Sequence, residues 1–175
     1  MPLFDNDRPL NDRAALLVLA SVALRAALPL LIGRALGGQD IVNYLIHAQQ
    51  TATNLRELTI FPSWGGGYNG GFGSPVLLFF PPLTSVIHAI PVLLGIPVMT
   101  GVSLLVILGH FFSGLSVFGW LRSNRAVVPA LAAAVVYMVA PYRLIDIYLR
   151  SALAEHWAFV WPPLILWASS SPRIG

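Results

Sequence analysis

The side chains that could do chemistry gather in two polar stretches of an otherwise apolar chain. The first stretch runs from Asp40 to Pro75, and the second runs from Tyr142 to Glu155. A carboxylate such as Asp40 can take a proton from a sugar hydroxyl, or hold a divalent cation (Mg²⁺ or Mn²⁺) that binds a phosphate. Because Asp40 follows Gly-Gly-Gln and precedes a helical pattern, it also suits a helix N-cap. Its sequence position allows both roles.

A helix that starts at Asp40 is predicted from the spacing of apolar residues. At roughly 100° per residue, one apolar arc is formed by Ile41, Leu45, Ala48, Ala52 and Leu55. Tyr44, His47 and Thr51 fall on a separate arc, near Asp40. We therefore expect an amphipathic helix at a membrane interface, with Tyr44 and His47 facing water. No second histidine stands three or four residues from His47, so a histidine metal motif is absent, and His47 could equally be a solvated interfacial residue.

A glycine-rich segment, residues 65–73, follows Trp64. It lacks the lysine of a phosphate-binding loop and follows no predicted strand. We expect either a close-packing loop or a lid over a site that faces lipid. Trp64 could stack on a sugar, or it could anchor the chain at the membrane surface as aromatic residues commonly do.

The second polar stretch contains Arg143, Asp146, Arg150 and Glu155. Asp146 and Arg150 stand four residues apart, which suits a salt bridge on a helix. Alternatively, Arg143 or Arg150 binds a lipid phosphate through its planar guanidinium group, with Glu155 as a second acid. On a continuous helix Glu155 would lie about 140° around the axis from Arg150, so the two share a face only if the helix breaks.

Composition indicates an all-α integral membrane protein. Hydrophobic residues make up 57% of the 175, charged residues 10%, and mean hydropathy is +0.75. A soluble domain would have about a quarter of its residues charged. All ten basic residues are arginines and they form no dense cluster, so we expect no nucleic-acid partner. The chain has no cysteine, which excludes disulfides and thiolate chemistry.

The apolar runs predict a polytopic helical protein. Residues 1–13 are expected to be a cytoplasmic tail, and the predicted spans are residues 14–36, 101–121, 126–141 and 156–168. A cleaved signal peptide is the alternative for residues 14–36. Residues 76–95 contain three prolines and could be interfacial, re-entrant or spanning. If residues 76–95 do not cross the membrane, five arginines, including Arg122 and Arg125, are cytoplasmic, and both polar stretches lie outside. If residues 76–95 cross, only four arginines are cytoplasmic. Because cytoplasmic segments are usually rich in basic residues, the first arrangement is favoured.

Seven short motifs in a fixed order carry a family resemblance. They are Asp40 after the first span, Phe61-Pro-Ser-Trp64, Asn69-Gly-Gly-Phe-Gly-Ser-Pro75, Phe80-Pro-Pro-Leu83, Ala140-Pro-Tyr-Arg143, Tyr148-Leu-Arg-Ser-Ala-Leu-Ala-Glu155 and Pro162-Pro-Leu164. Over residues 15–168 this order resembles the bacterial membrane proteins labelled "6-pyruvoyl-tetrahydropterin synthase-related". It is also similar to the wider C-type glycosyltransferase superfamily, which uses sugars linked to polyprenyl phosphate.

The resemblance implies a multi-pass enzyme of the bacterial cytoplasmic (inner) membrane. Such an enzyme moves a sugar from a polyprenyl-phosphate donor to an acceptor at the outer face, so its partners are the lipid bilayer and that donor. Asp40 matches the expected acid of the first outer loop, and Glu155 matches a second acid. The residues expected to bind substrate are Tyr44, His47, Trp64, Arg143 and Arg150.

Two features depart from the family pattern. Paired acids are common in the first outer loop of such enzymes, whereas here Gln39 precedes Asp40 and Asn43 follows it. Members of the family are also longer, so we expect this chain to be the amino-terminal portion of a multi-span domain. The alternative function is a non-catalytic transporter or an assembly component for cell-envelope polysaccharide. A water-filled path lined by Arg25, His88 and His110 would favour transport.

Overall fold

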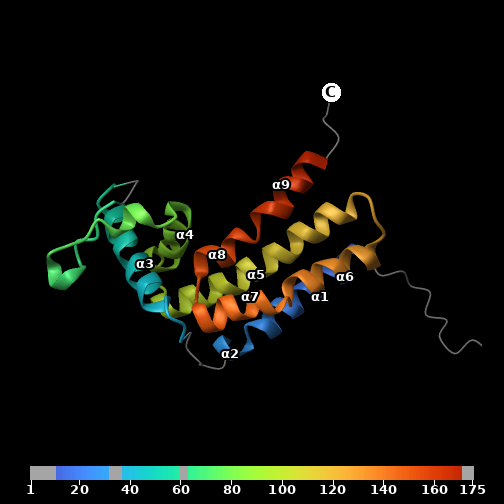
Figure 1. Ribbon diagram of the computed structural model, residues 1–175, viewed down its shortest axis with the longest axis horizontal. Coiled ribbons are helices and arrows are strands. Elements are labelled where there is room, and N and C mark those ends of the chain that lie inside the picture. The colour runs from blue at the N-terminus through green and yellow to red at the C-terminus, as the bar shows by residue number, and fades with distance from the viewer. Residues whose placement is uncertain (1–10, 32–36, 60–62, 171–175) are drawn as a thin grey trace, which may run out of the picture.

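The computed structural model describes residues 11–31, 37–59 and 63–170 (Figure 1). The α-helices are α1 (Asp12–Ala26), α2 (Leu28–Leu31), α3 (Ile41–Arg56), α4 (Pro82–Leu93), α5 (Val98–Arg122), α6 (Val127–Met138), α7 (Pro141–Ile145), α8 (Leu153–Ala158) and α9 (Trp161–Ser170). Short helical turns form η1 (Asn69–Gly71), η2 (Val76–Phe79) and the π-helical η3 (Asp146–Arg150). The described ranges contain no strand, only one isolated bridge between Gly65 and Ser74. The all-α prediction is confirmed.

Helix α5 is the axis of the fold, with α1 and α6 along one part of it and α3 and α4 at its amino-terminal end (Figure 1). Its glycines allow four other helices to approach closely. A Cβ atom at these glycines would collide with a neighbour in each of the following pairs: Gly101 with Pro91 of α4, Gly109 with His156 of α8, Gly114 with Met138 of α6, and Gly119 with Trp167 of α9. Small residues play this part at helix contacts within membranes.

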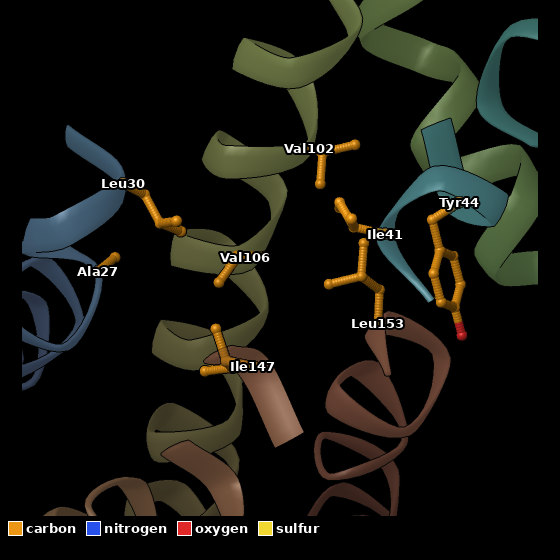
Figure 2. Packing of buried hydrophobic residues seen from close by; sticks show 8 residues of the cluster. All are labelled: Ala27, Leu30, Ile41, Tyr44, Val102, Val106, Ile147 and Leu153. Atoms are coloured by element: carbon orange, nitrogen blue, oxygen red, sulfur yellow. The ribbon is translucent and has the colours of Figure 1, made fainter. Parts of the chain in front are cut away.

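Two apolar clusters hold the helices around α5. One lies towards the carboxyl-terminal half of α5 and contains Ala15, Leu19, Ala23, Val117, Phe118, Ala130, Ala134 and Met138. The other lies towards the amino-terminal half, where Ile41, Tyr44 and Leu153 lie on one side of α5, Ala27 and Leu30 lie on the other side, and Val102, Val106 and Ile147 lie between them (Figure 2). This second cluster packs the start of α3 against η3 and α8, which brings the two polar stretches together.

Helix α5 has the length and composition of a membrane span. Its 25 residues cover about 37 Å, more than the hydrocarbon core of about 30 Å. Helices α6 and α7, which continue into η3, would form a second span if they are one element bent by 41°. The described residues thus include one helix, or two with the bent pair, that could cross a membrane by length and composition alone.

The other predicted spans are interrupted or short. The first begins as predicted, but α1 ends at Ala26 and α2 has four residues, while residues 32–36 lie outside the described part. Residues 156–168 are divided between α8 and α9, with a break after Ala158. Helix α4 has 12 residues and covers about 18 Å, less than a bilayer core. That length fits an interfacial or re-entrant position for residues 76–95.

The predicted helix after Asp40 is present as α3, but the expected exposure of its polar arc is wrong. Tyr44, His47 and Thr51 are buried, at 8%, 2% and 0% of their accessible surface. Helix α4 packs along α3, and the centre of the Phe80 ring lies 3.9 Å from that of His47. The arc is polar only at a few atoms, and the largely apolar segment after Pro75 covers its rings. The sequence pattern of α3 alone does not predict that a later segment covers Tyr44 and His47.

Leu153 should contribute strongly to stability because it is fully buried in the cluster that joins α3, α5, η3 and α8. Leu153→Ala is expected to lower the free energy of unfolding by about 2–5 kcal/mol. Leu149→Ala is the matched control, since Leu149 is 69% exposed, and it should change stability by less than about 0.5 kcal/mol. Chemical unfolding in detergent would measure both variants. Equal effects would contradict the packing described for Leu153.

Candidate functional site

Three hydrogen bonds join the start of α3 to the segment between η3 and α8. The backbone N–H of Asp40 donates to the Arg150 carbonyl oxygen (3.1 Å), and the N–H of Gly38 donates to Ser151 Oγ (3.2 Å). The Ala154 N–H donates to the Tyr44 hydroxyl (3.0 Å). Residues more than 100 positions apart in the chain are therefore fixed side by side. We call this contact the α3–α8 joint, and the candidate site surrounds it.

The chain turns sharply at Ser151, where the candidate site is assembled. Residues Asp146–Arg150 form a π-helical turn, a local form that is frequent at functional sites. Ser151 then adopts left-handed backbone angles (φ 54°, ψ 39°), which are uncommon for a residue other than glycine. Its hydroxyl donates to the Ile147 carbonyl (3.2 Å) and accepts from Gly38, which helps to hold this conformation. The turn reverses the chain and starts α8.

Arg150 collects three oxygen atoms at one nitrogen. Its Nη1 atom lies 2.9 Å from Asp146 Oδ1, 2.8 Å from Glu155 Oε2 and 3.1 Å from the Tyr142 hydroxyl. The Tyr142 hydroxyl also donates a hydrogen bond to Glu155 Oε1. The predicted pair of Asp146 and Arg150 is confirmed. Glu155 also pairs with Arg150, because the helix breaks at Ser151 and the two side chains no longer point in different directions as they would on a continuous helix. We call Tyr142, Asp146, Arg150 and Glu155 the acidic cluster.

The acidic cluster carries more negative than positive charge. Two carboxylates face one guanidinium group, and Asp40 adds a further acid at the α3–α8 joint. The hydrogen bond from Tyr142 and the ion pair with Arg150 lower the pKa of Glu155, so this carboxylate stays ionised at neutral pH. Glu155 can therefore accept hydrogen bonds from hydroxyl groups or bind a cation.

Tyr44 lies among the acids rather than in water. Burial is the main reason that the pKa of its hydroxyl is raised, the hydrogen bond from Ala154 opposes this, and the charges of Asp40, Asp146 and Glu155 add to the rise. All three carboxylates thus act on one phenol. Because the hydroxyl stays protonated and its oxygen accepts from Ala154, its proton is available for donation. Tyr44 links the Asp40 side of the site to the acidic cluster.

Asp40 occupies the N-cap position of α3 but makes no side-chain capping hydrogen bond. Its backbone N–H belongs to the α3–α8 joint, whereas its side chain is partly exposed. The capping role suggested by the sequence is therefore not what the carboxylate does in this structure. A carboxylate that the helix does not use remains available to a substrate.

Arg143 does not belong to the acidic cluster. Its side chain is 1% exposed, and its guanidinium carbon lies 4.5 Å from the centre of the Phe159 ring and 5.4 Å from that of Tyr137. Its Nη2 atom approaches His110 Nδ1 at 3.4 Å. In this position Arg143 is stabilised by two aromatic faces and is covered from solvent.

His47 and Trp64 lie away from the acidic cluster. His47 is enclosed between the rings of Tyr68 and Phe80, and burial lowers the pKa of its imidazole. Trp64 is 54% exposed beside the glycine-rich loop, near the carboxyl-terminal end of α3. The structure therefore brings Asp40, Tyr44, Arg150 and Glu155 together and places the other three predicted substrate contacts elsewhere.

The described part of the chain shows no group of three or more His, Asp or Glu side chains that could hold a metal ion. The divalent cation expected at Asp40 stays a prediction. Comparison with protein-family models, curated proteins and solved structures gave no match. The family resemblance of the motifs therefore also stays a prediction, and the geometry of the site carries the argument.

Two contributors to the site were not singled out from the sequence. Tyr142 stands 13 residues before Glu155, a spacing with no meaning on a continuous helix, and contacts it only because the chain reverses. Ser151 bonds to Gly38 across the α3–α8 joint. No local signal identifies either residue, because neither glycine nor proline marks the turn.

The α3–α8 joint makes a prediction about Gly38. A Cβ atom at Gly38 would lie 2.6 Å from both the carbonyl carbon of Arg150 and the backbone nitrogen of Ser151, closer than packing allows. Gly38→Ala should therefore separate α3 from the acidic cluster and destabilise the protein. Gly37→Ala is the matched control, because no atom lies within 4 Å of a Cβ atom there. Thermal unfolding in detergent should show a lower Tm for Gly38→Ala only; equal Tm values would contradict this account of the joint.

Proposed function

We propose that this protein is a polytopic protein of the bacterial cytoplasmic membrane that takes part in sugar transfer from a polyprenyl-phosphate donor, in the manner of C-type glycosyltransferases. The observation that carries the proposal is the α3–α8 joint, which sets Asp40 beside Arg150 of the acidic cluster. The resemblance implies one acid in each of two outer segments, and these two segments are in contact in the structure. Their meeting supports the proposal independently of the motif order.

In the proposed reaction Asp40 is the general base. It accepts the proton of the acceptor hydroxyl as the oxygen attacks the sugar carbon that is bonded to the donor phosphate, and that carbon–oxygen bond breaks to release polyprenyl phosphate. Glu155 would accept hydrogen bonds from sugar hydroxyls, because Tyr142 and Arg150 keep it ionised. Tyr44 would donate its proton in a hydrogen bond to the substrate, since its oxygen already accepts from Ala154.

The charge of the acidic cluster bears on the roles proposed for the arginines. Two carboxylates already offset the charge of Arg150, so a phosphate approaching it would also meet Asp146 and Glu155. Arg143 is enclosed by aromatic rings. These contacts favour sugar recognition by the acidic cluster over direct capture of the lipid phosphate by either arginine.

The contacts at the two ends of α5 support the proposed membrane topology. Near its carboxyl-terminal end, Arg122 Nε lies 2.8 Å from Asp12 Oδ1, so the proposed cytoplasmic tail meets the proposed cytoplasmic turn. Near its amino-terminal end, Val102 and Val106 belong to the same cluster as Ile41, Tyr44 and Leu153, which lie at the α3–α8 joint that we place outside (Figure 2). The two segments that we place in the cytoplasm thus contact each other near one end of α5. The segments that we place outside contact each other near its other end.

Asp40→Asn tests the proposed chemistry. Loss of one general base should lower sugar transfer by about 10²- to 10⁴-fold. Stability should hardly change, because the Asp40 side chain caps no backbone group. Asp12→Asn is the control, the same change at an exposed acid near the opposite end of α5. Transfer of labelled sugar from a polyprenyl-phosphate donor would be measured in membranes that contain each variant. Full activity of Asp40→Asn would remove Asp40 from the mechanism.

Cysteine labelling tests the proposed topology, since the chain has no cysteine of its own. Ser63 and Ser123 are both exposed, and the proposal places Ser63 outside the membrane and Ser123 in the cytoplasm. In intact cells, a membrane-impermeant thiol reagent should label Ser63→Cys and leave Ser123→Cys unlabelled. In lysed cells it should label both. The reverse pattern in intact cells would invert the topology.

A non-catalytic transporter is the second candidate, and the interior polar groups favour it. His110 and His156 are buried with their rings stacked 5.8 Å apart, and Arg143 lies beside them. Atoms without a hydrogen-bond partner include Nε2 of His110, Nδ1 of His156 and Nε of Arg143. The sequence suggested a transport path lined by Arg25, His88 and His110. In the structure Arg25 is exposed on α1, whereas His88 and His110 are buried. A transporter would use these groups, and Asp40→Asn would then leave substrate movement intact.

A further inference from the structure

An open groove lies at the carboxyl-terminal end of α3, away from the acidic cluster. It has a volume of about 570 Å³ and is lined by Gln50, Thr53, Asn54 and Glu57 of α3 and its end, with Trp64 and the start of the glycine-rich loop opposite. This volume falls within the range of about 300–1,000 Å³ that is usual for small-molecule sites. We call it the Trp64 groove.

The walls of the Trp64 groove are fixed by side-chain amides. Asn54 Nδ2 donates to the Trp64 carbonyl oxygen (2.8 Å), and Gln50 Oε1 accepts from the Gly67 N–H (2.8 Å). Gln50 Nε2 donates in turn to Asn54 Oδ1 (3.3 Å). The loop is also closed on itself by the paired backbone bonds of Gly65 and Ser74. Because its backbone is held at several points, the loop presents Trp64 in a defined position.

The Trp64 ring packs against the glycine-rich loop at Gly73. A Cβ atom at Gly73 would lie 2.6 Å from two carbon atoms of the indole, so the ring rests on the bare backbone there. Gly73 also has a positive φ of 82°, which glycine adopts without strain. Even so, Trp64 is 54% exposed. A large aromatic surface is thus held in place and left open to a ligand.

The lining chemistry suits a neutral polyhydroxylated ligand. Trp64 supplies the one large apolar surface, and the other lining residues are polar or glycine. Glu57 is the only charged residue among them, so the groove would repel phosphates and other anions. Thr53 Oγ1 donates to the Gln49 carbonyl and keeps an acceptor position, and the Glu57 carboxylate accepts from hydroxyl groups. The C–H face of a sugar ring would lie on the electron-rich face of the indole.

We propose that the Trp64 groove binds an oligosaccharide, which is the acceptor of the proposed sugar transfer; this assignment as acceptor rests on the proposed function. Helix α3 connects the groove to the proposed base. From Gln50 to Asp40 the helix rises by about 15 Å, farther than one sugar ring reaches. The ligand is therefore an extended saccharide, with its inner units in the groove and its reacting end at the α3–α8 joint.

Direct binding tests the groove without any transfer reaction. Chitotetraose, maltotetraose and mannotetraose would be titrated against the protein in nanodiscs, with saturation-transfer NMR as the readout. The wild-type protein should bind at least one of them, and Trp64→Ala should weaken that binding by about tenfold or more. Phe72→Ala is the matched control, because Phe72 is an 89% exposed aromatic residue of the same loop that does not line the groove. It should bind as the wild type does.

Glu57→Gln keeps the test decisive if Trp64→Ala disturbs folding. Glu57 is exposed, so its substitution should leave the Tm unchanged while weakening saccharide binding severalfold. The proposal is overturned if the wild type binds none of the three saccharides, or if Trp64→Ala and Glu57→Gln both bind as the wild type does. A failure of the proposed chemistry, seen as unchanged transfer in Asp40→Asn, is thereby distinguished from a failure of the groove, seen as unchanged binding in the groove variants.

Discussion

The contact of neighbouring side chains with the glycines of α5 is the constraint on which the rest of the structure depends. Four neighbouring helices place a bulky side chain against a glycine of α5, and none of these contacts leaves room for a Cβ atom. The positions of α4 and α8 follow from Gly101 and Gly109. Helix α4 covers one side of α3, and α8 forms a hydrogen bond with the first turn of α3. The geometry of the candidate site therefore depends on the spacing of the glycines of α5, although α5 contributes no residue to the site.

The features that could be predicted from the sequence are those set by short-range periodicity. Apolar composition indicated an all-helical chain, and the 3.6-residue period placed α3 to within about a residue of its start. The pair of Asp146 and Arg150 follows from its four-residue spacing, and the structure contains it. Asp40 and Glu155 were selected by residue type and by a family resemblance, and their segments were expected on one side of a membrane.

The features that could not be predicted depend on partners distant in the chain. Tyr44 and His47 were expected in water, but Phe80, more than 30 residues later in the chain, packs against both rings. Glu155 reaches Arg150 only through the left-handed turn at Ser151, which no local residue pattern marks. Arg143 was expected to bind substrate, but it is buried against two aromatic rings from separate helical segments. In each case a tertiary contact outweighs the local preference.

The sharing of a single arginine nitrogen has a consequence for how the acidic cluster responds to its surroundings. Asp146, Glu155 and Tyr142 compete for Nη1 of Arg150, so a proton or ligand gained by one of them changes the electrostatic environment of the other two. Groups coupled in this way titrate as a set, and their apparent pKa values belong to the cluster rather than to one residue. Tyr44 lies within the field of the same carboxylates. A change of charge at one carboxylate of the cluster therefore alters the electrostatic field at Tyr44, whose hydroxyl is part of the α3–α8 joint.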